Sequence, residues 1–274
     1  MRPEARAKRD AFLADIGTRP LVMGILNVTP DSFFDGGRFV AAENALDHAR
    51  QMIFEGCDII DVGAESVRPG AKPVDEALEM ARLDQVLPQL AVLNAPLSID
   101  TTKSTIAARA LSLGVVAVND VWGLQKDPRM ADLVAAAEAA IVIMHNRAEK
   151  DENIDIIADI RSFFDRSLAI ASRAGISRHR IVLDIGIGFA KTSRQNRDAI
   201  RRLDELKDYR LPIMVGASRK RFLGSLTGDG SEGTLAGTLA ANLAAIAAGA
   251  AIVRVHDVAD HVAALRVFAA IRNK

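Results

Sequence analysis

The feature that most constrains the fold of this chain is a regular alternation between short apolar runs and amphipathic stretches. The apolar runs are rich in β-branched residues, and glycine, proline or aspartate borders them. Such runs are typical of parallel strands that are buried on both faces of a sheet. Eight of them follow one another along the sequence: Leu21–Thr29, Asp58–Ala64, Leu97–Thr101, Val115–Val121, Ala139–His145, Arg180–Gly188, Pro212–Ser218 and Ala250–Asp257.

Helical patterns separate these runs. After the first run, the apolar residues at 45, 46, 49, 52 and 53 fall on one helical face, and Gly56 provides a stop. Similar patterns cover 75–93, 103–113, 127–138, 155–174, 194–207, 232–248 and 258–272. Eight strand–helix pairs in about 250 residues predict an α/β fold, a single-domain (β/α)8 TIM barrel. An open doubly wound sheet is the alternative, but it normally has fewer units and a glycine fingerprint after the first strand, which MGILNVTPDS lacks.

We therefore expect residues 18–274 to form one barrel domain and residues 1–17 to be an N-terminal extension. The 35 basic and 35 acidic side chains cancel, which disfavours binding to nucleic acid or to a membrane surface. No window approaches the roughly 20 apolar residues of a transmembrane helix. The N-terminus is charged and lacks the apolar centre of a signal peptide, and the chain has a single cysteine. These features predict a cytoplasmic location.

Polar residues gather where the predicted strands end, which is the face of a barrel that carries its chemistry. Every run contributes at least one of them: Asn27; Asp61 and Glu65; Asp100; Asn119 and Asp120; His145; Asp184; Ser218, Arg219 and Lys220; Arg254, His256 and Asp257. Arg254 and His256 lie two residues apart and therefore share one face of their strand. Because a buried arginine without an anionic partner is costly, this pair predicts a ligand anion or a carboxylate nearby.

Several of these residues also have a purely structural interpretation. Three aspartates could each cap a helix N-terminus: Asp61, Asp120 and Asp257. His145 could be a hydrogen-bonded histidine at a strand end, and Cys57 is predicted to be a core residue. The glycines of Gly186–Ile187–Gly188 could serve a turn, or they could let the backbone approach a flat ligand.

The remaining polar residues form two chemical sets. Asp100, Asn119 and Asp184 can bind a heterocycle rich in amino and ring N–H groups. The cations suit an anionic group such as a phosphate ester, and they are Arg68, Arg219, Lys220, Arg254 and His256. A polar heterocycle that bears a phosphate or diphosphate would satisfy both sets. No nucleophilic triad can be assembled, and one cysteine with five scattered histidines gives no zinc-site spacing.

Eight short motifs occur at these predicted loops: MGILNVTPDSFFDGG at 23–37, DVGAESVRPGA at 61–71, SIDT at 98–101, NDV at 119–121, MH at 144–145, DIGIGFAK at 184–191, GASRKRF at 216–222 and RVHDV at 254–258. In this order they make the chain similar to the dihydropteroate synthases of folate biosynthesis, from about residue 20 to about residue 270. The resemblance implies an enzyme that joins a dihydropterin-methyl diphosphate to para-aminobenzoate and releases diphosphate.

The resemblance also implies a role for each matching residue. The pterin diphosphate would be bound by Asp100, Asn119, Asp184, Lys220, Arg254 and His256. The expected catalytic residues among these are Asp100, Lys220, Arg254 and His256. Arg254 would lie against the pterin face and, with His256, would bind the diphosphate. Asn27 would ligate the Mg²⁺ that the diphosphate brings, since Mg²⁺ prefers oxygen ligands.

Aminobenzoate would contact four residues: Ser66, Arg68, Pro69 and Ser218. Ser218 is expected to open the helix after the seventh strand, where free N–H groups suit a carboxylate. The loops 28–38 and 64–73 would close over the site and exclude water. The resemblance further implies a homodimer and a target of sulfonamides.

The chain departs from the family pattern at five positions. Val67 stands where the family reads threonine, and Ile185 stands where it reads proline. Phe34, Ala64 and Ala190 stand where serine, glycine and glycine are expected. Because none of these changes removes a charged group, we expect them to tune affinity or inhibitor sensitivity.

Three other functions have to be separated from this one. A pterin-dependent methyltransferase should lack the ESVRPGA loop and the Ser-Arg-Lys cluster. A non-catalytic pterin-binding paralogue should keep the carboxylates and the amide but lose the cations. A phosphate-binding barrel isomerase would not explain three strand-end groups suited to a heterocycle. The loop and the cations are both present, which favours the synthase.

Overall fold

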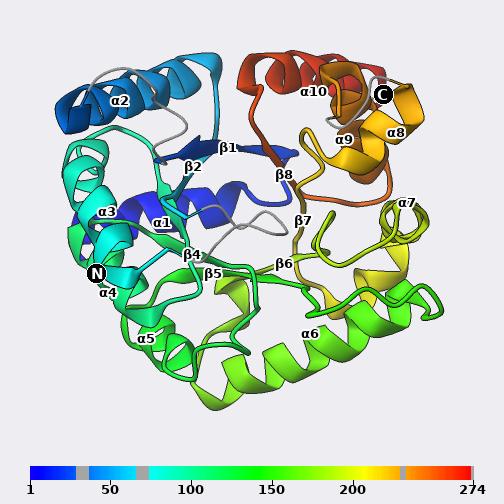
Figure 1. Cartoon of the computed structure of the whole chain (residues 1–274), viewed down its shortest axis with the longest axis horizontal. Helices are drawn as coiled ribbons and strands as arrows, with labels where there is room; N and C mark the ends of the chain where they lie inside the picture. The colour runs from blue at the N-terminus through cyan, green and yellow to red at the C-terminus, as the bar shows by residue number, and fades with distance from the viewer. Residues whose placement is uncertain (29–36, 66–73, 229–232, 273–274) are drawn as a thin grey trace.

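The computed structural model describes residues 1–28, 37–65, 74–228 and 233–272. Eight parallel strands close into a barrel in chain order, as predicted, and helices surround it (Figure 1). Each predicted run contains its strand. The strands are β1(Leu21–Asn27), β2(Ile59–Gly63), β3(Leu97–Asp100), β4(Ala117–Asp120), β5(Ala140–Met144), β6(Ile181–Asp184), β7(Ile213–Val215) and β8(Ile252–Val255).

The surrounding helices agree with the predicted amphipathic stretches at most positions. They are α2(Gly37–Glu55), α3(Glu76–Leu90), α4(Ser104–Leu113), α5(Met130–Ala136), α6(Ile156–Arg173), α7(Ser193–Arg201), α9(Leu235–Ala247) and α10(Val258–Arg272). The helix predicted over 194–207 is divided, because a 3-10 helix, η3(Leu203–Tyr209), follows α7. A short helix that the sequence patterns did not predict, α8(Arg221–Thr227), precedes α9, and a 3-10 turn, η2(Arg178–Arg180), precedes β6.

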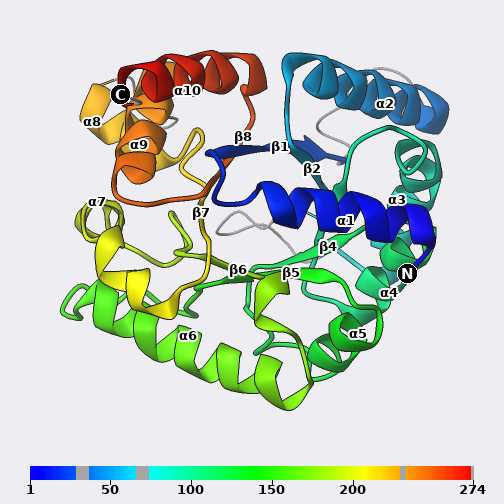
Figure 2. The same cartoon turned by 180° about the vertical axis from the view of Figure 1, so that it is seen from behind.

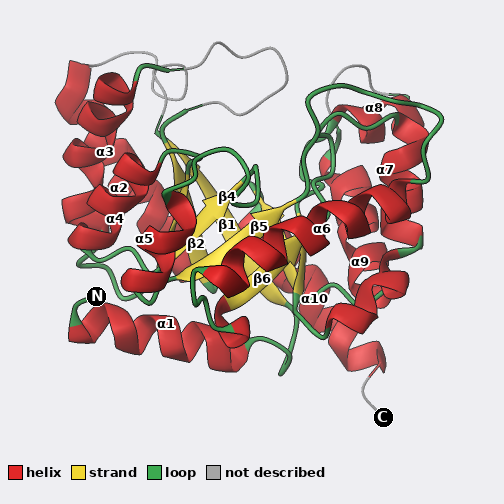
Figure 3. Ribbon diagram, turned by 90° about the horizontal axis from the view of Figure 1, so that it is seen from below, coloured by secondary structure: helices red, strands yellow, loops and turns green. Residues whose placement is uncertain are grey.

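The first helix, α1(Pro3–Asp15), closes the end of the barrel where the strands begin. It crosses the barrel in the view from behind and lies beneath the strands in the side view (Figures 2 and 3). Its Ala5 and Phe12 are buried against the inward-facing Leu21 and Ile252. The ammonium of Lys8 donates a 2.6 Å hydrogen bond to the carbonyl of Leu93. The predicted extension therefore supplies part of the core, and the domain boundary at residue 18 stays a prediction.

The interior of the barrel changes from apolar to polar along the strands. Residues two apart on a strand face the same side, so each inward position repeats at the second residue. Toward the α1 end the inward residues form a buried apolar cluster. Two residues further along four strands, the same face carries a polar group: Asp61 after Ile59, Asn119 after Ala117, Asp184 after Val182 and Arg254 after Ile252. The pleat therefore points these polar groups inward at one mouth of the barrel.

A second and larger apolar core lies between the barrel and its helices. Cys57 packs against it, as predicted, although its side chain is only partly buried. Burial raises the pKa of the Cys57 thiol to about 12, so the thiol stays protonated near neutral pH. Among the described helices, none combines the length and the apolar composition needed to cross a membrane.

Candidate active site

Four polar side chains form a connected cluster at the mouth where the strands end. One carboxylate oxygen of Asp61, Oδ2, accepts hydrogen bonds from Arg254 Nε at 2.7 Å and from Asn119 Nδ2 at 2.8 Å. The Nη2 atom of Arg254 donates to Asp100 Oδ2 at 2.9 Å. Asp61, Asn119 and Asp100 are all buried. Two carboxylates from neighbouring strands thus fix the orientation of the Arg254 guanidinium plane.

The same cluster contains buried acceptors that have no hydrogen-bond partner within the described part of the chain. They are Asp61 Oδ1, Asp100 Oδ1 and Asn119 Oδ1. A buried polar atom without a partner costs about 1–3 kcal/mol, and native proteins rarely leave several together. The cluster is therefore suited to a ligand that brings N–H donors into the mouth of the barrel.

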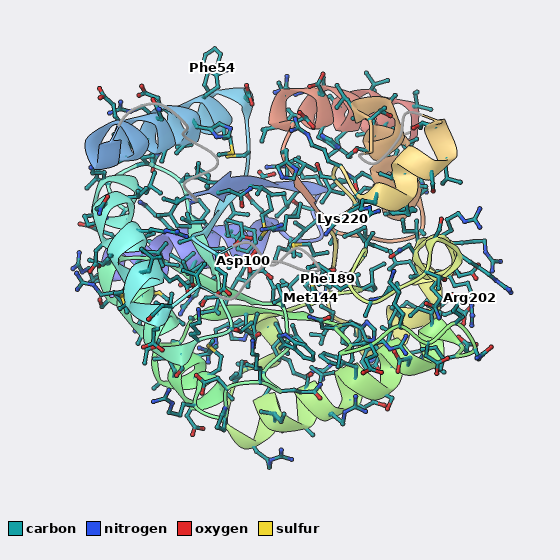
Figure 4. All side chains as sticks on the ribbon, viewed as in Figure 1. Phe54, Asp100, Met144, Phe189, Arg202 and Lys220 are labelled. Carbon is teal, nitrogen blue, oxygen red and sulfur yellow. The ribbon has the colours of Figure 1, made fainter. Side chains whose placement is uncertain are left out.

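A pocket opens over this cluster. Its walls combine polar groups with apolar side chains: Asp100, Asn119, Val121, Met144, Asp184, Ile187, Phe189, Gly216, Lys220 and Arg254. Figure 4 shows Asp100, Met144, Phe189 and Lys220 facing the central region of the barrel. The Lys220 ammonium lies 4.6 Å from the centre of the Phe189 ring, which is a cation–π distance. Five of the residues predicted to bind a pterin diphosphate therefore line one pocket.

Two carboxyl groups of the pocket, Asp100 and Asp184, have pKa values raised toward neutral pH. Burial raises the pKa of Asp100, and the nearby Arg254 opposes that shift. Burial likewise raises the pKa of Asp184 to about 6, opposed by the hydrogen bond from the backbone N–H of Gly186. For Arg254, burial lowers the pKa, but the carboxylates of Asp61 and Asp100 outweigh it and the net shift is upward. The guanidinium thus stays charged in a pocket where the pKa values of Asp100 and Asp184 are raised.

The loop after β6 needs its glycines for a turn and also forms a wall of the pocket. Asp184 Oδ1 accepts a hydrogen bond from the Gly186 N–H at 2.7 Å, and Gly186 has a φ of +63°. A Cβ on Gly186 would lie 1.9 Å from the carbonyl oxygen of His145, which no side chain could tolerate. Ile187 and Phe189 of this loop line the pocket. The turn interpretation of Gly186 is therefore confirmed, whereas the approach of this backbone to a flat ligand stays a prediction.

Ser218 and His256 lie together beside the pocket. The Ser218 hydroxyl is 2.9 Å from His256 Nδ1, and it accepts a 3.2 Å hydrogen bond from the His256 N–H. The expectation that Ser218 opens a helix was wrong, because α8 begins at Arg221 with Lys220 as its N-cap. The parallel register of β7 and β8 explains the pair, since Val215 lies opposite Val253 and each residue follows three positions later. The contact of Ser218 with aminobenzoate stays a prediction.

The aspartates with a structural interpretation have three different outcomes. Asp61 caps no helix and holds Arg254 and Asn119. Asp120 accepts hydrogen bonds from the N–H groups of Trp122 and Leu124, so it stabilises a turn. Asp257 directly precedes α10, where its carbonyl accepts a hydrogen bond from the His261 N–H, and its carboxylate forms an ion pair with Arg219 at 2.6 Å. The spacing of two in the sequence places Asp61 on the same face of its strand as Ile59, and the structure shows that this face points into the barrel.

His145 is fully hydrogen-bonded and does not line the pocket. Its Nε2 atom lies 3.0 Å from Asp159 Oδ2, and its Nδ1 atom lies 2.7 Å from the Nζ atom of Lys191. The structural interpretation of this histidine is therefore correct. Neither Lys191 nor Asp159 lies at the end of a strand, so the strand-end pattern of the sequence gives no signal for them.

Asn27 lies at the end of β1 next to the cluster. Its Oδ1 atom and Asp100 Oδ2 are each 3.9 Å from the place that a Cβ on Gly63 would occupy. Both oxygens thus border a space that stays open because residue 63 is a glycine. Over the described ranges, no group of three or more histidine, cysteine or acidic side chains could hold a metal ion. A Mg²⁺ ion that keeps several waters and binds substrate oxygens needs few protein ligands, so an amide oxygen fits it here.

The predicted aminobenzoate contacts Ser66, Arg68 and Pro69, like Phe34 and Val67, lie outside the described residues. The two residues that flank 66–73 are tied to one lysine. Lys103 Nζ donates to Glu65 Oε2 at 2.7 Å and to the carbonyl of Val74 at 2.9 Å. The same ammonium also pairs with Glu79, which is fully buried. The residues on either side of 66–73 are therefore held by a partly buried ion-pair network.

Comparisons with known proteins match nearly the whole chain to a single protein family. The model of the pterin binding enzyme family matches residues 23–256. Dihydropteroate synthase of Bacillus subtilis is 42% identical over 257 residues, which cover 93% of this chain and 90% of the relative. A crystal structure of dihydropteroate synthase from Clostridium difficile, in the presence of pteroic acid, superposes with a TM-score of 0.90 at 44% identity, covering 95% of this chain and 99% of that one.

A third comparison is with dihydropteroate synthase of Xanthomonas albilineans in complex with 7,8-dihydropteroate, at a TM-score of 0.84 and 37% identity, covering 93% of this chain and 95% of that one. The barrel and its polar mouth thus define a pterin-binding enzyme. Within that class the chain belongs to the dihydropteroate synthase family, whose members are transferases of folate biosynthesis.

Proposed function

We propose that this chain joins (7,8-dihydropterin-6-yl)methyl diphosphate to para-aminobenzoate and forms 7,8-dihydropteroate and diphosphate. The observation that carries the proposal is the cluster of Asp61, Asn119, Asp100 and Arg254, in which three buried oxygens have no hydrogen-bond partner among the described residues. A pterin offers an amino group and ring N–H groups as donors to such oxygens. The family relationship supplies the same substrate class independently.

In this proposal the pterin lies in the pocket against the guanidinium plane of Arg254. Arginine stacks on flat rings when its plane is fixed, and here two carboxylates fix it. Asp184 and Asn119 accept and donate at the ring edge, and Lys220 reaches the pocket beside Phe189. With one tryptophan and one tyrosine in the whole chain, recognition depends on hydrogen bonds and arginine stacking rather than on an aromatic cage.

The reaction is a substitution at the pterin methylene carbon. The bond from this carbon to the diphosphate oxygen breaks, a bond to the aniline nitrogen forms, and that nitrogen loses one proton. A neutral aniline is already nucleophilic, so no strong base is required. The Asp100 carboxylate stabilises positive charge that develops on the carbon, while Arg254 and His256 stabilise the departing diphosphate. Asp100, Lys220, Arg254 and His256 are therefore the proposed catalytic residues.

Mg²⁺ is the proposed metal, and Asn27 is its proposed protein ligand. When bound, the ion neutralises charge on the diphosphate and makes it a better leaving group. The open space bordered by Asn27 and Asp100 oxygens supports this assignment. Ser66, Arg68, Pro69 and Ser218 are the proposed contacts of aminobenzoate.

The family relationship supports three further proposals: a cytoplasmic location, a homodimer and inhibition by sulfonamides. Val67 and Ile185 depart from the family pattern, so the strength of sulfonamide inhibition is expected to differ from that of the relatives. The oligomeric state can be measured by sedimentation, and inhibition can be measured in the turnover assay described next.

The experiment is a coupled assay for released diphosphate with the pterin diphosphate as substrate, with and without para-aminobenzoate and Mg²⁺. We expect product only when all three are present. Lys220→Ala and Arg254→Ala should each lower turnover, with pterin binding measured separately. Pterin binding without product under every condition would instead identify a non-catalytic paralogue, and wild-type turnover in either variant would contradict the site assignment.

A further inference from the structure

A buried lysine that the proposed reaction does not use holds the loop after β6 from inside. The side chain of Lys191 is buried, with the residue only 3% exposed. Its Nζ atom donates to the Gly186 carbonyl at 2.7 Å and to the Phe189 carbonyl at 3.3 Å, and it lies 2.7 Å from His145 Nδ1. These three acceptors match the three hydrogens of an ammonium group, while burial lowers the pKa of Lys191 to about 7. Lys191 therefore ties both ends of the turn to His145, the residue that follows β5.

His145 connects this lysine to a carboxylate on α6. Burial lowers the pKa of His145 to about 4, so its ring is neutral near pH 7. With Lys191 on Nδ1, the ring proton lies on Nε2 and is donated to Asp159 Oδ2 at 3.0 Å. Arg147 Nε is 3.3 Å from the same carboxylate oxygen. The buried ammonium is thus linked to a partly exposed carboxylate through one neutral imidazole.

The segment held in this way is a wall of the pterin pocket. Ile187 and Phe189 line the pocket, and the Phe189 ring faces the Lys220 ammonium. The first residue of the loop is Ile185, which lacks the fixed φ that proline has. The loop conformation therefore depends on side-chain contacts, and Lys191 supplies the hydrogen bonds to the carbonyls of Gly186 and Phe189.

We propose that Lys191, His145 and Asp159 form a positioning relay that fixes this wall and thereby sets the affinity for the pterin. None of the three touches the pocket, so they act through Gly186 and Phe189. The inference rests on the proposed function only in taking the ligand of this pocket to be a pterin. It predicts an effect on pterin binding that is separate from the chemical step and from aminobenzoate.

The test uses the full chain and two variants that break the relay at opposite ends, Lys191→Met and Asp159→Leu. The first removes the ammonium, and the second removes the acceptor while leaving the lysine. We expect each to raise the dissociation constant of a free pterin, and the KM of the pterin diphosphate, by about tenfold, the value of one hydrogen bond to a charged group. The kcat and the KM of aminobenzoate should change by less than about threefold.

Two further variants separate positioning from general destabilisation. Asp159→Asn keeps an acceptor oxygen and should restore most of the pterin affinity that Asp159→Leu loses. Asp155→Asn is the matched control, because Asp155 caps the same helix and asparagine caps equally well. Nitrogen-15 NMR should show His145 in the neutral form with its proton on Nε2 in the wild-type protein.

Folded Lys191→Met and Asp159→Leu proteins with wild-type pterin affinity would overturn the relay. An equal rise in both KM values, or a positively charged His145 at neutral pH, would overturn it as well. If the wild-type protein binds pterin but forms no product, the proposed reaction fails, while the binding measurements still test the relay.

Discussion

Replacing Asp61 by alanine tests whether a buried carboxylate organises the site. The change removes two hydrogen bonds from one oxygen, to Arg254 at 2.7 Å and to Asn119 at 2.8 Å. It also leaves the buried guanidinium with Asp100 alone as its ion-pair partner. Losing one partner of a buried ion pair typically costs about 3–5 kcal/mol, and the remaining pair to Asp100 favours the lower end. For a chain of this size, about 3 kcal/mol lowers the Tm by roughly 6–12 °C.

Urea unfolding followed by circular dichroism measures this loss, and pterin binding measured on the same samples should weaken. The control is Asp47→Ala, which breaks a 3.1 Å pair with Arg50 whose side chains are 65% and 60% exposed. Such a surface pair is expected to change stability by less than about 0.5 kcal/mol. If Asp61→Ala were as stable as the Asp47→Ala control and bound pterin with wild-type affinity, Asp61 would not be the residue that positions Arg254.

Three other outcomes follow from the site and its loop. Since burial raises the pKa of Asp184 to about 6, its carboxylate gains a proton as the pH falls through that value, and pterin affinity should fall with it. A fluorescence titration between about pH 5 and 8 checks this, and Asp184→Asn should bind weakly with a smaller pH dependence. Ala190 has a φ of +43°, so Ala190→Gly should raise the free energy of unfolding by about 1 kcal/mol, measured as a shift of the urea midpoint. Chelation of divalent ions should abolish turnover, and Asn27→Ala should raise the Mg²⁺ concentration that restores it, whereas unchanged Mg²⁺ dependence would remove Asn27 as a ligand.

The barrel could be predicted from the sequence because both of its signals are local. Each strand is a short run that is apolar on both faces, and a change of residue type marks its end. The polar mouth was predictable for the same reason, since Asp100 and Asp184 are the last residues of their strands, Asn119 and Arg254 are the second to last, and the carboxyl ends of parallel strands meet at one edge. A spacing of two also shows which residues of one strand share a face.

The parts that could not be predicted depend on contacts between distant elements. Ser218 and His256 are 38 positions apart, and only the register of β7 with β8 brings them together. Lys191 approaches His145 across 46 positions and lies past the end of its strand, where composition alone suggests an exposed lysine. α8 begins at Arg221 rather than at Ser218, and sequence patterns do not locate the first residue of a helix reliably. Its N-cap, Lys220, makes no side-chain capping hydrogen bond and is not a residue type that marks a helix start.

The packing of α1 against the barrel has a consequence for the order in which the parts of the chain fold. Phe12 lies in α1, which precedes all eight strands in the chain, yet it packs in a cluster that includes Ile252 from β8. Arg9 reaches the carbonyl of Glu138, halfway along the chain. Contacts that span so much sequence form slowly, because a large loop must close before they stabilise anything. Although α1 is synthesised before the strands, it is thus expected to dock after them, and in a ribosome-bound chain that still lacks β8 the packing around Phe12 is incomplete.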